Sequence, residues 1–115
     1  MRYSFVGALG KEGALDWGGD FSGNIPASHC FLPDWWDTKL YLTIRGYARE
    51  GGYEGCQVDW GAFAIKVNGP EMLTILEECY GSMDEVDPKA LLGKYADFAR
   101  KLGTANYVAL ISTEM

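Results

Sequence analysis

The sequence predicts a single α+β domain, residues 1–115, in which a four-stranded, mainly antiparallel sheet carries two helices on one face. Three observations support this prediction. The chain has 115 residues, about the size of one domain. Apolar residues alternate in its first and middle segments, which is typical of strands, and then recur at helical spacing in two consecutive segments. A last apolar segment follows, and this order of elements favours a sheet with helices packed against it.

The first expected strand covers residues 2–9, and a long loop follows it. Tyr3, Phe5 and Gly7 alternate with the residues between them, and Gly10 closes the segment. Residues 10–38 keep no sustained period, and they contain several residues that interrupt regular structure: Gly13, Gly18, Gly19, Gly23, Pro26 and Pro33. A loop of this length is uncommon unless it has a function.

Residues 39–48 and 56–67 are expected to form a hairpin. In the first of these segments, Leu40, Leu42 and Ile44 share one side of a strand, with the period of two that a half-buried sheet requires. The second segment alternates in the same way. The glycine-rich sequence at 51–55 lies between them and supplies the turn.

Two helices are expected at 70–80 and 87–102, before a last strand at 106–112. Pro70 suits the first turn of the first helix, and Gly81 ends it. The second begins at Asp87-Pro88, which offers a capping oxygen and a proline just inside the helix, and it ends at Gly103. The spacing of the apolar residues after each start gives each helix one buried face.

The composition is that of an ordinary globular protein from a reducing compartment. Apolar residues make up 48% and charged residues 23% of the chain. No apolar run is long enough to cross a bilayer, and the first residues do not resemble a signal region, so we expect a cytoplasmic protein. Cys30, Cys56 and Cys79 are odd in number and widely spaced, which indicates buried thiols, not a disulfide framework.

The net charge of −6 is concentrated in one part of the chain. Between Val67 and Lys89 there is no Lys or Arg, whereas six acidic residues occur there: Glu71, Glu77, Glu78, Asp84, Glu85 and Asp87. A field of one sign disfavours direct contact with nucleic acid and accelerates encounter with a basic protein. The plainer alternative is that these charges only keep a helix face soluble, although such faces usually mix both signs.

The long loop supplies candidate apolar anchors for the same contact. Trp17, Trp35 and Trp36 lie in it, and exposed tryptophans are typical anchors of protein interfaces. The alternative is that these side chains fold back to cover the sheet. Because neighbouring side chains of an extended chain point to opposite sides, one of Trp35 and Trp36 should stay accessible.

Motifs for cofactor or metal chemistry are weak throughout. His29 lies next to Cys30, but the closely spaced ligand pairs of a zinc site do not occur. The glycines and lysine of residues 7–13 lack the spacing and the Ser or Thr of a phosphate-binding loop. We therefore expect no metal, no cofactor and no catalytic residues.

These observations favour a small cytoplasmic inhibitor, not an enzyme, which neutralises a basic partner by stoichiometric docking. A nuclease toxin or a nucleic-acid-targeting defence complex is a partner of this kind, and the inhibitor would act as a monomer or homodimer without contacting a membrane. Its size, acidity and α+β pattern are similar in kind to those of toxin-immunity proteins and phage anti-defence proteins, although no family motif supports the analogy. Two alternatives remain: a module that binds a sugar or nucleotide through the aromatic loop, and a small enzyme that uses the loop's carboxylates.

Overall fold

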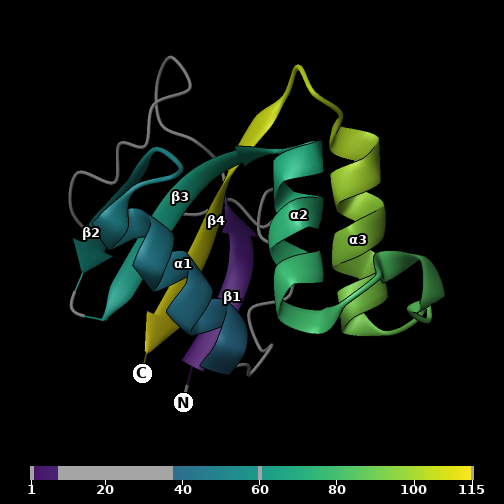
Figure 1. Cartoon of the computed structure of the whole chain (residues 1–115), viewed down its shortest axis with the longest axis horizontal. Helices are drawn as coiled ribbons and strands as arrows, with labels where there is room; N and C mark the ends of the chain where they lie inside the picture. Colours follow the sequence, from purple (N-terminus) through teal and green to yellow (C-terminus); the bar gives the residue numbers. More distant parts are fainter. Residues whose placement is uncertain (1, 8–37, 60, 115) are drawn as a thin grey trace.

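Four antiparallel strands form one sheet in the computed structural model of the chain, which describes residues 2–7, 38–59 and 61–114. Their order is β1-β4-β3-β2, and their bounds are Arg2–Gly7 for β1, Gly55–Asp59 for β2, Ala62–Asn68 for β3 and Tyr107–Glu114 for β4 (Figure 1). The strand expected at 2–9 is confirmed over the described residues 2–7, and the last strand is confirmed with a slightly later start and end. Almost all of the expected loop at 10–38 lies outside the described residues.

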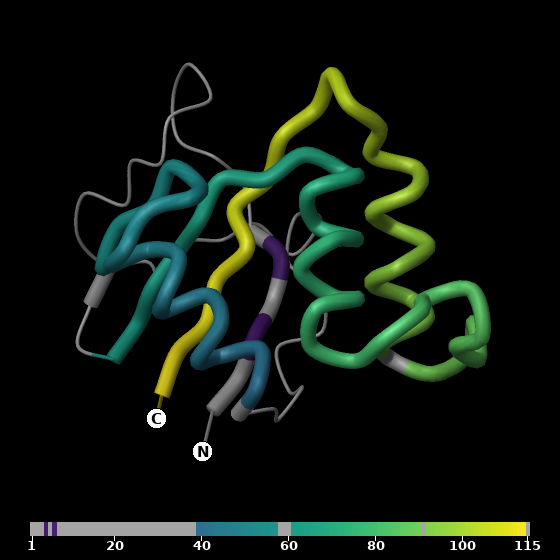
Figure 2. The backbone as a smooth tube through the Cα atoms, in the orientation of Figure 1, coloured from purple at the N-terminus to yellow at the C-terminus, as the bar shows by residue number. Residues whose placement is uncertain are grey.

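Three α-helices pack with this sheet in the described part of the chain, one more than expected. They are α1 (Thr38–Glu50), α2 (Gly69–Tyr80) and α3 (Leu91–Leu102), and a short 3₁₀-helix, η2 (Met83–Glu85), lies between the last two. Figure 1 shows α1 crossing the sheet, with α2 and α3 side by side next to it. The tube in Figure 2 shows that the segment between α2 and α3 forms a loop at one end of this helix pair. The α+β class is confirmed.

The strand expected at 39–48 is wrong, because this segment forms α1. Leu40 and Ile44 are spaced correctly for a strand, but they are also one helical turn apart, and both are fully buried together with Tyr41. Leu42, which the strand interpretation placed beside them, is 41% exposed. The β-branched and aromatic residues of the segment favour a strand locally, and packing against the sheet overrides that weak preference.

The expected hairpin is also corrected. Residues 56–67 were expected to form one strand paired with 39–48, but the segment turns back on itself, so that β2 pairs antiparallel with β3. Gly61 adopts a φ of 65° in this turn, a conformation that favours glycine. A single glycine among alternating apolar residues is a weak turn signal, which is why the sequence did not predict this turn. After the turn, β3 also pairs antiparallel with β4.

The start and end of α2 follow the expectation closely. Asn68 precedes the helix, and its side-chain oxygen accepts a hydrogen bond from the backbone N–H of Glu71 at 3.0 Å. The Glu71 carboxylate in turn accepts from the backbone N–H of Asn68 at 3.0 Å. This reciprocal pair, with Pro70 in the first turn, satisfies two backbone donors that a helix leaves open. Gly81 ends the helix with a φ of 85°.

The start of α3 is later than expected. Asp87 does not cap a helix beginning at Pro88. Its carboxylate accepts from the backbone N–H of Lys89 at 2.9 Å, and its carbonyl accepts from Ala90 at 3.0 Å, which closes a turn. This turn lies directly on Gly93, where an added Cβ would be 2.0 Å from the Asp87 carbonyl oxygen. The helix begins at Leu91 and ends before Gly103 as expected.

The core lies between the sheet and the three helices. Its largest buried members come from both layers: Val6, Leu40, Tyr41, Ile44, Ile65, Val67, Met72, Ile75, Leu76, Tyr95 and Leu110. Two polar side chains are buried with them, and the Ser4 and Ser112 hydroxyls lie 2.7 Å apart in a hydrogen bond across β1 and β4. The Tyr95 hydroxyl of α3 donates to the Ser4 carbonyl at 2.8 Å. Buried polar groups need such partners, so this cluster fixes α3 against β1.

Two cysteine thiols are described, those of Cys56 and Cys79, and both are partly buried. Burial raises the pKa of the Cys56 thiol, and the nearby charge of Glu54 acts in the same direction. The Cys79 thiol donates to the Thr43 hydroxyl at 3.3 Å. Cys30 lies outside the described residues. Within the described ranges, no helix is long and apolar enough to span a membrane.

Candidate protein-binding face

The six acidic residues of the central block do not form one cluster. Glu71 lies in the first turn of α2, whereas Glu77 and Glu78 lie in its last turns, about 9 Å further along the axis. The remaining three follow in η2 and the next turn: Asp84, Glu85 and Asp87. The structure therefore groups residues 77–87 at one end of α2 and leaves Glu71 at the other.

Several of these carboxylates have partners within the protein. Glu71 caps α2, and Asp87 holds the turn before α3, as described above. Asp84 lies 3.4 Å from the guanidinium of Arg100, which also donates to the Met83 carbonyl at 3.2 Å. Arg100 of α3 thus lies beside the acidic segment 71–87, which has no Lys or Arg of its own. All five carboxylates of residues 77–87 are exposed, and Glu77 and Glu85 take part in none of these contacts.

Glu78 links α2 to α1. Both of its carboxylate oxygens lie 2.8 Å from the Tyr47 hydroxyl, which donates to them. This hydrogen bond raises the pKa of Tyr47 to about 12, and partial burial and the negative charge of Glu78 act in the same direction. A carboxylate near a helix C-terminus is mildly unfavourable on its own. The phenolic donor from α1 offsets this unfavourable position.

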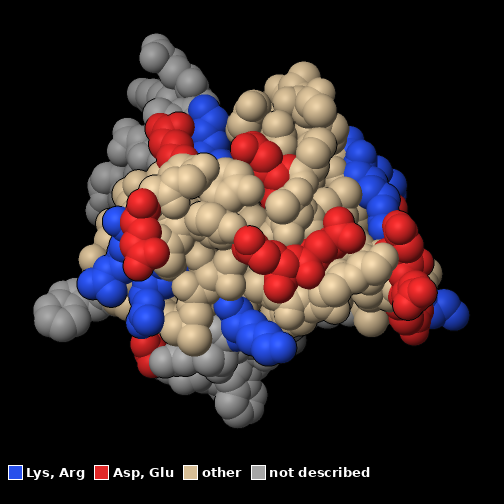
Figure 3. Space-filling model, viewed as in Figure 1, with Lys and Arg blue, Asp and Glu red and all other residues tan. Residues whose placement is uncertain are grey.

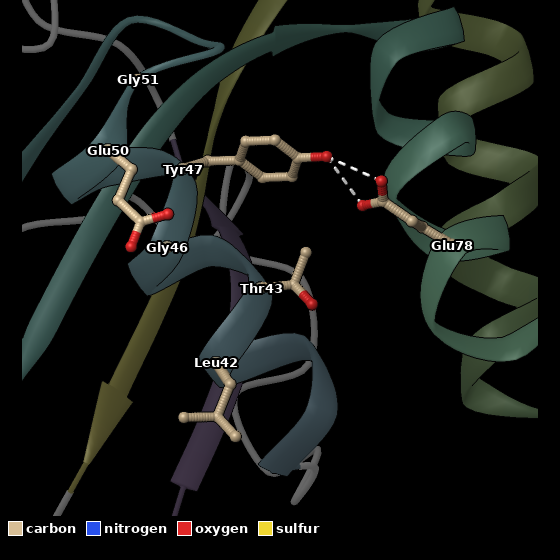
Figure 4. A pocket seen from close by; sticks show the side chains of 7 residues that line it. All are labelled: Leu42, Thr43, Gly46, Tyr47, Glu50, Gly51 and Glu78. Carbon is tan, nitrogen blue, oxygen red and sulfur yellow. Dashed lines mark hydrogen bonds between the residues drawn. The ribbon is translucent and has the colours of Figure 1, made fainter.

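A cleft of about 400 Å³ lies beside this bond, between α1 and α2. Figure 4 shows Tyr47 extending from α1 to the Glu78 carboxylate, with the other lining residues along α1. They are Leu42, Thr43, Gly46, Tyr47, Glu50, Gly51 and Glu78. The lining contains two carboxylates and no Lys or Arg among the residues that the structure describes. The cleft is therefore acidic, with an aromatic ring and an exposed leucine in its walls.

Helical spacing positions the α1 side of this cleft. Thr43, Gly46, Tyr47 and Glu50 recur at the spacing that places residues on one face of a helix. Glu50 was not among the predicted site residues, because residues 39–48 were expected to form a strand that ends before it. A search of residues 38–50 for a period of 3.6 would have found the face, since the buried Leu40, Tyr41 and Ile44 follow the same period.

The glycine turn after α1 packs against the Tyr47 ring. Gly51 and Gly52 have φ values of 93° and 108°, and an added Cβ on Gly52 would lie 2.9 Å from the Tyr47 ring. Only glycine fits this position without strain. The turn brings Tyr53 edge-to-face with Tyr47, with ring centroids 4.8 Å apart. Burial raises the pKa of Tyr53, and the charges of Glu71 and Glu78 add to this effect.

Tyr53 lines a second cleft, of about 440 Å³. Its lining residues are Gly52, Tyr53, Glu54, Lys66, Glu71 and Tyr107. Here the charge is partly neutralised, because the Lys66 ammonium lies 3.9 Å from the Glu54 carboxylate and 5.1 Å from the centroid of the Tyr107 ring. Of the two clefts, the one between α1 and α2 has the stronger negative charge.

Two basic residues of α1, Arg45 and Arg49, lie against other rings. The Arg45 guanidinium is 5.7 Å from the centroid of the Tyr41 ring, and that of Arg49 is 5.8 Å from the Phe63 ring. Figure 3 shows a band of acidic side chains across the middle of the viewed face, with a basic group below it and acidic and basic side chains intermixed at the left and right margins. The expected anchors Trp17, Trp35 and Trp36 lie outside the described residues.

No group of three or more metal-ligating side chains occurs in the described ranges. Comparison with known proteins identifies no relative: no family model, no curated protein and no solved structure matches this chain.

Proposed function

We propose that this protein is a small acidic inhibitor that binds a basic protein stoichiometrically through the face formed by the α1–α2 cleft and residues 77–87. One observation carries the proposal. Glu50 and Glu78 both line the cleft, whose described lining contains no Lys or Arg, and the exposed Glu77 and Glu85 lie nearby in the sequence, in α2 and η2. Tyr47 and Leu42 add apolar area to this charge.

Charge and apolar contact would have different roles in such a complex. An exposed ion pair contributes only about 0 to 1 kcal/mol, so the acidic residues would chiefly steer and orient the partner. Affinity would come from apolar side chains that become buried, and Leu42, at 41% exposure, is one of these. Tyr47 supplies a ring that is already fixed by its bond to Glu78.

The partner's chemistry follows from this face. Proteins that bind or cut nucleic acid carry clusters of Lys and Arg for the phosphate backbone, and an acidic surface competes for those clusters. We therefore place nuclease toxins and nucleic-acid-targeting defence complexes first among the candidates. Covering a basic site is sufficient for inhibition and requires no cofactor.

The experiment is capture of partners from a lysate of the native host at about 50 mM and about 500 mM salt, because high salt screens exposed charges. Glu77→Lys and Glu85→Lys are the test variants, because both side chains are exposed and neither takes part in the contacts described above. Glu54→Lys makes the same charge change next to Lys66 and is the matched control. The purified partner's activity is then measured with increasing amounts of this protein.

We expect a basic partner that is captured at low salt and lost at high salt. The two test variants should capture less of it than the control does. The purified partner should be inhibited at a one-to-one ratio. Capture that is insensitive to both variants would contradict the acidic face. A captured partner whose activity does not change would contradict inhibition.

A further inference from the structure

We infer that a second copy of this chain docks on the exposed side of α1, in a two-fold dimer that pairs the α1 helix of each copy with the α2 helix of the other. In this dimer Arg45 and Arg49 of one copy meet Glu77 and Glu78 of the second copy. The dimer goes beyond the proposed function, because it assigns an occupant to a basic side of α1 that the acidic inhibitor does not use.

The exposed side of α1 carries a basic strip, formed by Arg45 and Arg49. Leu42, Arg45 and Arg49 recur at intervals of three and four residues, so they lie along one side of the helix. Glu50, the one acidic residue of α1, lines the cleft toward α2. Each of the two guanidinium groups lies over a ring, and no ion pair joins either one to a carboxylate of the described residues. Their N–H donors can therefore bond a carboxylate from outside.

The exposed side of α2 carries an acidic strip, formed by Glu77 and Glu78. Both are exposed, whereas Met72 and Leu76 are fully buried on the opposite side of the helix. Glu78 already accepts the single phenolic hydrogen of Tyr47. Because a carboxylate has about four acceptor positions, Glu78 can still accept further donors.

Three features of these two helices are unfavourable within a single copy. Arg45 and Arg49 are like charges one helical turn apart, which destabilises a helix. Gly46 lies inside α1, where glycine is less stable than alanine, yet an added Cβ there would meet no atom within 4 Å. Glu77 carries a negative charge near the C-terminus of α2, where the helix dipole opposes it. Residues that break local preferences in this way are typical of functional surfaces.

The arrangement of the helices makes this surface complementary to itself. α1 and α2 lie side by side on the same face of the sheet (Figure 1), so the basic and acidic strips belong to one face of the molecule. A two-fold axis that lies in the interface and follows the border between the helices places α1 of each copy over α2 of the other. Each basic strip then meets an acidic strip, and every contact occurs twice.

Apolar contact adds to this charge complementarity. Leu42 is 41% exposed beside the basic strip, and its burial in both copies removes apolar surface from water. Gly46 has no side chain, so the second copy can approach the backbone of α1 closely at this point. Exposed ion pairs contribute little, so we expect a weak dimer that forms at high protein concentration and dissociates in salt.

The test is sedimentation equilibrium of the full chain at protein concentrations from about 10 μM to about 1 mM, the range in which a weak dimer forms. The salt concentration is about 50 mM in one series and about 500 mM in the other. We expect the mass to rise with concentration from 12.7 kDa toward twice that value at low salt. At high salt it should stay at 12.7 kDa.

Two double variants each reverse one strip. Arg45→Glu with Arg49→Glu makes the basic strip acidic, and Glu77→Lys with Glu78→Gln makes the acidic strip basic, with a glutamine that can still accept from Tyr47. Each variant alone should weaken the dimer at least about tenfold, because like charges then face each other. An equimolar mixture of the two should restore the dimer, because every strip then meets a strip of opposite charge.

Lys94→Glu with Lys101→Glu is the matched control, because it makes the same charge change as the arginine variant on exposed residues of α3. It should weaken the dimer less than about threefold, since only the screened net charge changes at the interface. Equal weakening by the control and by the arginine variant would overturn the inference. A mixture of the two strip variants that stays monomeric would do the same.

Failure of the dimer and failure of the proposed function give different results. A chain that stays at 12.7 kDa at about 1 mM protein and low salt overturns the dimer and leaves the basic strip to another acidic partner. If that monomeric chain still captures a basic protein, the docking function stands. If the chain dimerises as expected but captures and inhibits no basic protein, the proposed function fails and the dimer stands.

Discussion

The hydroxyl of Tyr47 donates to both carboxylate oxygens of Glu78, each at 2.8 Å, and so connects α1 to the last turns of α2. The two residues are 31 positions apart, and neither lies in the buried core. Their contact places a ring and a carboxylate side by side at the surface, which is the arrangement on which the candidate site depends.

Replacing Tyr47 by Phe removes this link and keeps the ring. We expect the free energy of unfolding to fall by about 0.5 to 1 kcal/mol, because the hydrogen bond is exposed and water replaces the donor for Glu78. Urea denaturation measures the change. Tyr107→Phe, at a ring that is 44% exposed, is the control and should be neutral. A loss above about 3 kcal/mol would show that Tyr47 has a larger structural role than one exposed bond.

The titration of Tyr47 tests the same hydrogen bond through its effect on the pKa of the phenol. Its pKa of about 12 in the folded protein lies above the ordinary value of about 10, so the folded state holds the proton more tightly than the unfolded chain. This contribution to stability is complete below pH 10 and is lost as pH rises from about 10 through about 12. NMR of the labelled tyrosine rings should show the pKa of Tyr47 lowered toward 10 in Glu78→Gln. An unchanged pKa would mean that burial, not Glu78, causes the shift.

Two glycines should respond oppositely to alanine. A Cβ at Gly93 would lie 2.0 Å from the Asp87 carbonyl oxygen, so the turn before α3 must move, and we expect a loss of about 1 to 3 kcal/mol. A Cβ at Gly46 meets no atom within 4 Å, and alanine there should stabilise α1 by about 0.5 to 1 kcal/mol. Thermal unfolding of both variants measures the difference. Similar effects at both positions would contradict the packing of the turn on Gly93.

The buried pair of Ser4 and Ser112 should show strong coupling. Either Ser→Ala change leaves one buried hydroxyl without its partner at 2.7 Å and should cost about 1 to 3 kcal/mol. The double variant removes both hydroxyls and should cost clearly less than the two single losses together. A double-mutant cycle by denaturant unfolding measures this coupling. Additive losses would mean that each hydroxyl is satisfied independently of the other.

The part of the site on α2 was predictable, and the part on α1 was not. Glu77 and Glu78 stand out in the sequence because no basic residue accompanies them, and Pro70 and Gly81 define the helix that carries them. Glu50 was missed because residues 39–48 satisfy a period of two as well as a period of 3.6 over a short length. Tyr47 and Glu78 are distant in sequence, so no local pattern shows that they meet.

The sequence by itself determined the α+β class, the bounds of α2, the end of α3 and the last strand, because these depend on local signals: capping residues, prolines, glycines and apolar spacing over consecutive turns. Only the tertiary structure decided that residues 38–50 are helical, since burial of Leu40, Tyr41 and Ile44 against the sheet outweighs a weak local preference for a strand. It also decided which acidic side chains have partners. Arg100 reaches Asp84 from α3 and Tyr47 reaches Glu78 from α1, so the strength of the acidic face depends on contacts between helices that no single segment encodes.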